Sequence, residues 1–303
     1  MLTAKPWRTE ALIRLGLSVL ICVFMGALVM CSLRLVQGNA AGRTLLPIAV
    51  ILAGFGALIA ALVLTRKSWD IERTPARLMI FLLSLLTGLT LVMVAQDLTH
   101  AATVKAGLWQ MVVVELSFQG AALVLIGPFL REHQTTWSAG FGFGNDPRRA
   151  VLLGLLVAAA ALPLGLLQEA MAALLSLLHV AADAQVAVQA LQDAPTWVQR
   201  LPLGFVAIVL APPAEEVLFR GLMYPFVKRA GFPRLALWGT ALFFAAIHWN
   251  LVSFVPLALL ALLLTWLYEK TDNLLAPIAA HSVFNALNFV ALQIFDQAWS
   301  QPR

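Results

Sequence analysis

The sequence predicts an all-α protein, a polytopic membrane helix bundle of eight or nine transmembrane helices. Of its 303 residues, 61% are hydrophobic and only 12% are charged, and the mean hydropathy is +0.88. Soluble globular chains are only roughly 45 to 50% apolar. Apolar runs of about 20 residues also recur along the chain, and each can cross a hydrocarbon core about 30 Å thick as a helix.

Nine apolar runs are candidate spans. The first follows the basic residues Lys5 and Arg8 and is too long for the hydrophobic region of a cleaved signal peptide, so we expect a retained signal anchor. A tenth stretch, residues 179–199, is too polar to span and is expected to form a surface helix or loop. The candidate spans are residues 11–36, 45–64, 78–94, 107–130, 150–178, 201–227, 235–249, 252–268 and 274–295.

The charged residues predict the orientation of the chain. The N-terminus and every second connector, residues 65–77, 131–149 and 228–234, are basic, and the positive-inside rule places them in the cytoplasm. The formal net charge of +5 resides in these short loops, where it sets topology. We therefore expect membrane lipid and no nucleic acid as a partner, and an integral, multi-pass protein of the bacterial inner membrane with a cytoplasmic N-terminus.

The character of the spans changes near Asn145 to Arg149. Before this point the spans carry few polar side chains, and after it come nearly all the polar residues at membrane depth. We therefore divide the chain into residues 1–149, N-terminal transmembrane helices of unknown role, and residues 150–303, which we expect to hold a polar cavity.

An ionisable residue inside a span is costly unless it is paired or hydrated, so each one is a functional candidate. The stretch from Pro212 to Arg220 contains Glu215 and Glu216. The proline pair predicts a helix break with both glutamates near a new helix N-terminus. Glu216 and Arg220 are spaced i, i+4 and are expected to form an ion pair. That pairing makes Glu215 available as a general base.

Two further spans carry polar residues at a matching depth. His248 ends the run that contains Phe244, and His281 shares a helix face with Asn285 at i, i+4 in the last span. Counted from the cytoplasmic ends of their spans, Glu215, His248 and Asn285 differ by only about 5 Å in depth at 1.5 Å per residue. These side chains can therefore converge in one catalytic cavity in the C-terminal half.

Such a set is suited to acyl transfer to water. Glu215 and His248 would deprotonate a water, while His281 and Asn285 would donate hydrogen bonds to the developing oxyanion. No cofactor is required in this scheme. The alternative is zinc or another divalent metal held by Glu215, Glu216, His248 and His281. We favour the metal-free scheme because Asn285 makes better sense as an oxyanion donor than as a ligand, and no His-Glu-x-x-His arrangement is present.

Three motifs occur in order on successive hydrophobic segments: Glu-Glu-x-x-x-Arg (Glu215, Glu216, Arg220), Phe-x-x-x-His (Phe244, His248) and His-x-x-x-Asn (His281, Asn285). Together they resemble the CAAX protease and bacteriocin-processing family, the Abi or Rce1-like intramembrane proteases. The resemblance covers about residues 201–295, with a family core starting near Ala150. It implies a membrane endopeptidase in which the first glutamate and first histidine activate water, and the second histidine and the asparagine form the oxyanion hole. Family members are often described as metalloproteases.

The sequence therefore predicts an intramembrane endopeptidase that hydrolyses peptide bonds near the cytoplasmic membrane face, in residues 150–303. Its catalytic residues would be Glu215, His248, His281 and Asn285, supported by Glu216, Arg220 and Phe244. The expected partner is a peptide or protein substrate, either lipid-modified or anchored in the membrane. The alternative is a non-catalytic transporter or immunity-type scaffold whose buried polar cluster binds an ion or a partner.

Overall fold

A computed structural model describes residues 5–37, 45–66, 75–99, 108–180, 186–192, 194 and 196–299. All regular structure in these ranges is helical, and eight helical stretches are long and apolar enough to cross a membrane. The predicted all-α, polytopic membrane bundle is confirmed. The chain divides into two compact units, Arg8–Phe129 and the residues up to Trp7 together with those from Leu130 onward. We call them the N-terminal unit and the C-terminal unit.

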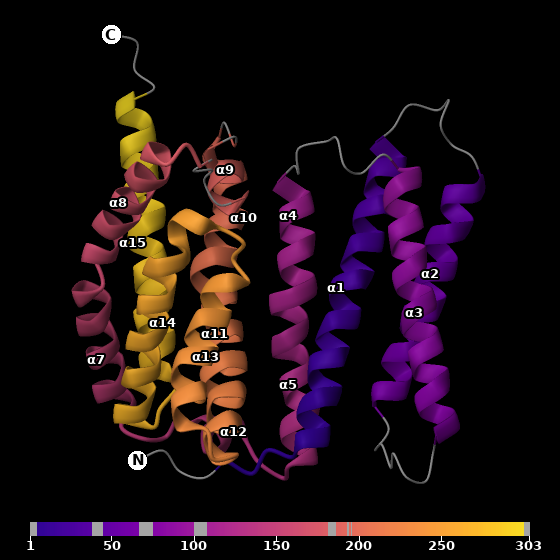
Figure 1. Cartoon of the computed structure of the whole chain (residues 1–303), viewed down its shortest axis with the longest axis horizontal. Coiled ribbons are helices and arrows are strands. Elements are labelled where there is room, and N and C mark those ends of the chain that lie inside the picture. The colour runs from indigo at the N-terminus through magenta and orange to yellow at the C-terminus, as the bar shows by residue number, and fades with distance from the viewer. Residues whose placement is uncertain are drawn as a thin grey trace. The chain divides into compact units, whose positions relative to one another are not determined.

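The N-terminal unit is built from long apolar helices (Figure 1). Helix α2 packs along α3, and α1 packs on both. At Gly88 a Cβ atom would lie 2.5 Å from Cδ2 of Leu58, so α2 and α3 approach closely where the side chain is missing. The core is aliphatic and aromatic, and includes Leu28, Leu58 and Phe81. The helices are α1 (Thr9–Gln37), α2 (Leu45–Thr65), α3 (Pro75–Leu98), α4 (Leu108–Glu115), the π-helical η3 (Leu116–Gly120) and α5 (Ala121–Glu132), which continues into the C-terminal unit.

The C-terminal unit packs its helices around α14 and α15. Helix α15 lies along α7, while α13 and α8 pack on α14 (Figure 1). Gly154 permits the close packing of α7 on α15, since a Cβ there would lie 2.5 Å from the carbonyl oxygen of Ala276. Its helices are α6 (Trp137–Phe141), α7 (Pro147–Ala160), α8 (Pro163–Leu177), α9 (Val186–Gln192), α10 (Trp197–Phe205), η4 (Val206–Leu210), α11 (Ala211–Glu216), η5 (Val217–Met223), α12 (Tyr224–Arg229), α13 (Pro233–Ala246), α14 (Leu251–Thr271) and α15 (Leu275–Trp299).

The segment with Pro212 and Pro213 differs from the prediction. Helices α10 to α12 form one continuous span, Trp197–Arg229, so the proline pair does not start a new helix, and the predicted N-terminus beside Glu215 and Glu216 is wrong. The π-helical segment η4 lies directly before the prolines, and it changes the hydrogen-bond register there. The helix therefore accommodates the missing N–H groups of the two prolines by changing its hydrogen-bond register, and it does not end there.

Helix α13 also differs from its predicted span, residues 235–249. It ends at Ala246 after 14 residues, a length of about 21 Å at 1.5 Å per residue, which is too short to cross the hydrocarbon core. His248 therefore lies in the connector between α13 and α14 and not in a helix. Among the described residues there are eight candidate spans.

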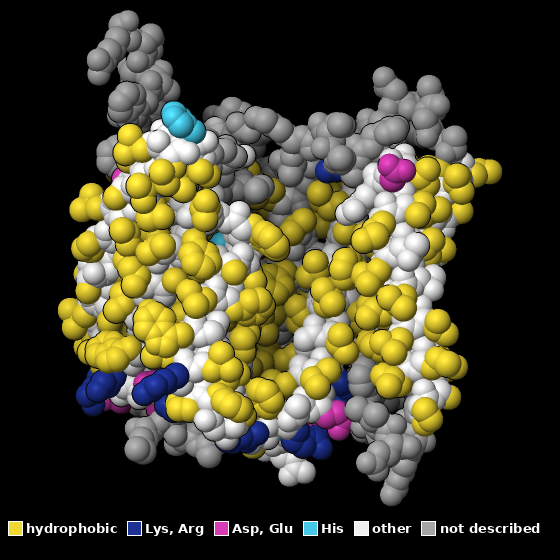
Figure 2. All heavy atoms as spheres, in the orientation of Figure 1, with side chains coloured by type: hydrophobic (Ala, Val, Ile, Leu, Met, Phe, Trp, Pro, Cys, Tyr) yellow, Lys and Arg dark blue, Asp and Glu magenta, His cyan; other side chains and the backbone are white. Residues whose placement is uncertain are grey.

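The outer surface is typical of a protein surrounded by lipid. Figure 2 shows hydrophobic side chains over the visible helices, with Lys and Arg side chains gathered at one end of them. Large side chains such as Leu166 and Val198 are 76% and 78% exposed, an arrangement that a soluble protein would not tolerate over so many helices.

Candidate active site

Glu216 and Arg220 form a buried ion pair in the C-terminal unit. Nη1 of Arg220 donates to Oε1 of Glu216 at 2.8 Å, at the predicted i, i+4 spacing. The guanidinium also donates to the carbonyl oxygen of Ala261 at 2.9 Å and to Oγ1 of Thr265 at 3.4 Å. Glu216 is 0% and Arg220 is 2% exposed. A charge buried to this degree is costly unless it is paired, and here helix α14 supplies the remaining partners.

The ring of Phe244 packs against the guanidinium of Arg220 in this ion pair. The guanidinium carbon of Arg220 lies 4.8 Å from the ring centroid, within the range of a cation–π contact. The same ring packs edge-on against Phe219 at 5.2 Å and against His281 at 5.8 Å, and it lies 4.9 Å from the ring of His248. Phe244 therefore contacts both histidines and the arginine, and it is fully buried.

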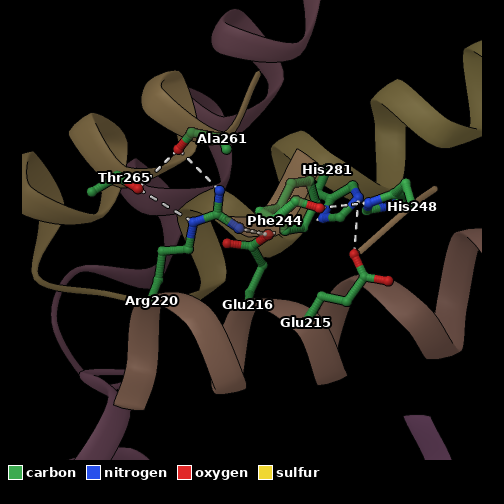
Figure 3. Close-up of polar contacts among 8 residues, drawn as sticks. All are labelled: Glu215, Glu216, Arg220, Phe244, His248, Ala261, Thr265 and His281. Carbon is green, nitrogen blue, oxygen red and sulfur yellow. Dashed lines mark hydrogen bonds and ion pairs between the residues drawn. The ribbon is translucent and has the colours of Figure 1, made fainter. Parts of the chain in front are cut away.

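His281 lies between the two glutamates. Its Nδ1 is 2.9 Å from Oε1 of Glu216, and its Nε2 is 3.8 Å from Oε2 of Glu215. Figure 3 shows Glu215, Glu216 and Arg220 projecting from one helix toward these partners. Because a carboxylate can only accept, the Nδ1 atom of His281 donates to Glu216 when that group is ionised. His281 is 3% exposed and Glu215 is 6% exposed.

His248 is held by its own backbone. Its Nδ1 lies 2.7 Å from the carbonyl oxygen of Phe244, four residues before it. A carbonyl accepts, so Nδ1 carries the hydrogen, and in the neutral ring Nε2 then carries the lone pair. The His248 side chain is half-buried. The ring is thus oriented with one basic nitrogen directed away from its anchoring carbonyl.

Asn285 contacts the same long helix at another level. Its Nδ2 donates to the carbonyl oxygen of Ala207 at 2.8 Å. In η4 the N–H of Ala211 bonds to Val206, and the next residue is Pro212, which has no N–H. The carbonyl of Ala207 therefore lacks a backbone donor, and Asn285 supplies one. His281 and Asn285, predicted to share a helix face, both face the helix formed by Trp197–Arg229.

The four predicted metal ligands do not form a ready ligand cluster. Within the described ranges, no three His, Cys, Asp or Glu side chains lie close enough to hold one ion. The Nδ1 atoms of His281 and His248 are engaged with Glu216 and with the backbone, so Nε2 is the atom of each ring that could act as a ligand.

Several functional contacts were missed by sequence reasoning. Ala207 and Ala261 act through their carbonyl oxygens, which no side-chain pattern can indicate. Thr265, a polar residue in the middle of the apolar helix α14 and 1% exposed, gave a signal that could have been used. Gly221 is a further case, since Nε1 of Trp7 donates to its carbonyl oxygen at 2.8 Å.

The motif-bearing segment is similar to a known protein family. Residues 197–287 match the family described as type II CAAX prenyl endopeptidase Rce1-like. This match contains Glu215, Glu216, Arg220, His248 and Asn285 with their neighbours, and it confirms the resemblance predicted from the three motifs. No solved structure is significantly similar to the chain.

Two curated bacterial proteins are similar to part of the chain. The protein YpbD of Bacillus subtilis is 35% identical over 78 residues, which are 24% of this chain and 37% of that protein. The UPF0177 protein YaiF of Lactococcus lactis is 33% identical over 94 residues, 29% of this chain and 40% of that protein. The similarity thus spans less than half of each relative.

Proposed function

We propose, from the premise that residues 197–287 belong to the Rce1-like family of type II CAAX prenyl endopeptidases, that the chain is an intramembrane endopeptidase using Glu215 and His248 to activate water. The family supports a membrane protease, a hydrolase acting on a membrane-associated peptide or protein. In this proposal Glu215 and His248 do the chemistry, no metal is required, and the peptide bond is cleaved near the cytoplasmic membrane face.

The main observation in support of this function is the position of His281. It lies within 4 Å of both carboxylates, hydrogen-bonded to Glu216 and facing Glu215. Glu216 also accepts from Arg220, so its charge is offset from two sides. The neighbouring carboxylates are therefore given different surroundings, which is how a site keeps one acidic group structural and the other chemically active.

In the proposed reaction, the Glu215 carboxylate takes a proton from a water that also hydrogen-bonds to Nε2 of His248. The resulting hydroxide attacks the carbonyl carbon of the scissile peptide, and the carbonyl oxygen becomes an oxyanion. Nε2–H of a protonated His281 and the second N–H of Asn285 stabilise it. Glu215 then returns the proton to the leaving amine as the C–N bond breaks.

The substrate proposed is a membrane-anchored or lipid-modified peptide. Exposed apolar side chains cover the visible face of the unit that holds the site (Figure 2), so the proposed substrate would approach this unit from within the bilayer. The basic ends of the helices support an orientation with that end in the cytoplasm.

A reconstituted cleavage assay tests the proposal. The full-length protein in phosphatidylethanolamine–phosphatidylglycerol vesicles would receive a quenched fluorescent peptide ending in a farnesylated Cys-a-a-X sequence, with the unprenylated peptide in parallel. We expect Glu215→Gln and His248→Ala each to lower kcat by about 100-fold or more, since general acid–base groups contribute roughly 10²–10⁴ in rate. Activity should persist in EDTA.

Glu169→Gln is the matched control, because Glu169 is an exposed carboxylate on α8 of the same unit. It should cleave at the parental rate. Parental cleavage by Glu215→Gln would contradict the proposed role of that residue, and loss of activity in EDTA that added zinc restores would replace the metal-free scheme. If neither of the two peptides nor any member of a membrane-anchored protein library is cleaved, the result would favour the alternative, a non-catalytic transporter or immunity-type scaffold.

A further inference from the structure

Residues 5–7 lie at the other end of the chain from the site yet pack into the C-terminal unit. We call them the strap. Trp7 is 1% exposed and Lys5 is 5% exposed. The Trp7 ring packs edge-on against His133 at 5.4 Å and at a tilt against Phe141 at 5.9 Å. The strap is therefore packed into the C-terminal unit by its side chains.

The strap bonds to the helix that carries the glutamates. Nε1 of Trp7 donates to the carbonyl oxygen of Gly221 at 2.8 Å, in a buried contact. The residue four positions after Gly221 is Pro225, which has no N–H to offer. The α-helical partner of the Gly221 carbonyl is therefore missing, and the indole of Trp7 takes its place.

A second set of bonds fixes the strap beyond Pro225. The guanidinium of Arg229 donates to the carbonyl oxygens of Lys5 and Trp7. Nζ of Lys5 pairs with Asp272 at 3.3 Å. The strap is thus attached four residues before Pro225 and four residues after it, and it bridges the backbone defect that the proline creates.

A related arrangement occurs at Pro212. There Asn285 donates to the Ala207 carbonyl, which lies five residues before the proline and lacks a backbone donor. Pro212, near the start of α11, and Pro225, in α12 just after η5, thus lie on either side of Glu215, Glu216 and Arg220, and near each proline a side chain from elsewhere in the sequence donates to a backbone carbonyl. One of these side chains belongs to a recognised motif and the other is Trp7.

We infer that Trp7 is a positioning residue for the hydrolysis proposed above: it fixes the register of η5 and so places Arg220 and Glu216 against His281. This inference rests on the proposed function. Arg220 immediately precedes Gly221, and its guanidinium must meet Glu216, Ala261 and Thr265 together. A shift of η5 along its axis would disturb all three contacts and the hydrogen bond from His281.

Phe141 packs tightly against Gly221 and so limits how far η5 can shift along its axis. A Cβ atom at Gly221 would lie 2.7 Å from Cε1 of Phe141, so the Phe141 ring sits directly against the backbone that accepts from Trp7. Phe141 is fully buried, and its carbonyl accepts from the N–H of Leu274 at 3.0 Å. The strap and the α6 turn therefore hold η5 from neighbouring directions.

The test is a double-mutant cycle in the full-length protein. Trp7→Phe keeps an aromatic ring but removes the N–H, and we expect kcat to fall about tenfold with KM unchanged, because a shift of η5 would displace Glu216 from His281. Pro225→Ala restores the backbone N–H that an α-helical hydrogen bond to the Gly221 carbonyl requires. In the Trp7→Phe, Pro225→Ala double variant we therefore expect kcat to return to within about twofold of the Pro225→Ala value.

Hydrogen–deuterium exchange gives a readout that does not depend on activity. Trp7→Phe should speed amide exchange in residues 217–229, and Pro225→Ala should reverse the change. Trp238→Phe, an indole substitution at a 56% exposed position on α13, is the control and should alter neither measurement.

Additive losses in the double variant would overturn the inference, as would unchanged exchange and kcat in Trp7→Phe. If the parent protein cleaves no peptide but the exchange cycle behaves as expected, the proposed function fails while the structural support of η5 by Trp7 stands.

Discussion

Helices α1 to α3 of the N-terminal unit differ from the Trp197–Arg229 span of the C-terminal unit in helix geometry and in the polar side chains that they bury. The first three are unbroken α-helices whose contacts are made by aliphatic side chains and glycines such as Leu28, Leu58 and Gly88. The second changes between α- and π-helical geometry four times and buries Glu215, Glu216 and Arg220. Regular helices pack closely and keep their backbone hydrogen bonds, whereas an interrupted helix also leaves carbonyls without a backbone donor, and distant side chains can bind these.

The difference shows what an intramembrane site requires. Polar side chains at membrane depth need partners, and a carbonyl that has lost its backbone donor is one such partner. The π-helical segments and prolines release the carbonyls of Ala207 and Gly221, which anchor Asn285 and Trp7. The comparison predicts that substitutions in the interrupted helix affect catalysis and folding together, while those in α1 to α3 affect folding alone.

The largest effect is expected from Arg220→Ala. It leaves Glu216 buried at 0% exposure without its guanidinium, and removal of one partner of a buried pair costs about 3–5 kcal/mol. The free energy of unfolding in detergent should fall by this amount, and cleavage should be lost. The pair of changes Glu216→Gln with Arg220→Met should recover much of the stability but no cleavage. Recovery of cleavage would mean that the ion pair is dispensable for the chemistry.

A smaller but selective effect is expected from Asn285→Ala. If the second N–H of Asn285 serves the oxyanion, kcat should fall by about 10²–10³ with little change in KM. Stability should also drop, because the Ala207 carbonyl loses its donor. Steady-state kinetics and thermal unfolding of the same preparation separate the two roles. A lowered melting temperature with parental kcat would restrict Asn285 to supporting η4.

The smallest of the three effects is expected in the N-terminal unit. Gly88→Ala places a methyl group 2.5 Å from Leu58, and overpacking of this kind costs about 1–3 kcal/mol. The midpoint of thermal unfolding should fall while kcat stays at the parental value. Gly56→Ala on α2 is the matched control, since nothing lies within 4 Å of its Cβ position. A fall in kcat for Gly88→Ala would show that the regular helices do influence the site.

Much of this architecture could be predicted from side-chain patterns. Hydropathy predicted the membrane bundle because lipid imposes the length and composition of its spans. The i, i+4 spacing predicted the ion pair of Glu216 and Arg220, which the structure contains. The roles of Glu215, His248, His281 and Asn285 in catalysis stay predictions, as does the division of function at residue 149.

What sequence reasoning missed depends on the backbone. Pro212 and Pro213 signalled a broken helix, but the register change in η4 kept the helix continuous, and such a change leaves no mark in hydropathy. The apolar run through Ile247 and Trp249 concealed the end of α13 at Ala246, because hydropathy does not separate a helix from a connector of the same polarity. No pattern in the sequence around Trp7 indicates that its indole donates to the carbonyl oxygen of Gly221.

The hydrogen bond between Trp7 and Gly221 joins residues 214 positions apart, and the whole N-terminal unit is translated between them. At 5–20 residues per second, Trp7 is made roughly 10–40 s before its acceptor exists. The helix with Glu215 and Glu216 therefore receives the support of Trp7 only after the whole N-terminal unit has been synthesised. The site is thus completed late, when a residue made before the N-terminal unit meets a helix made after it.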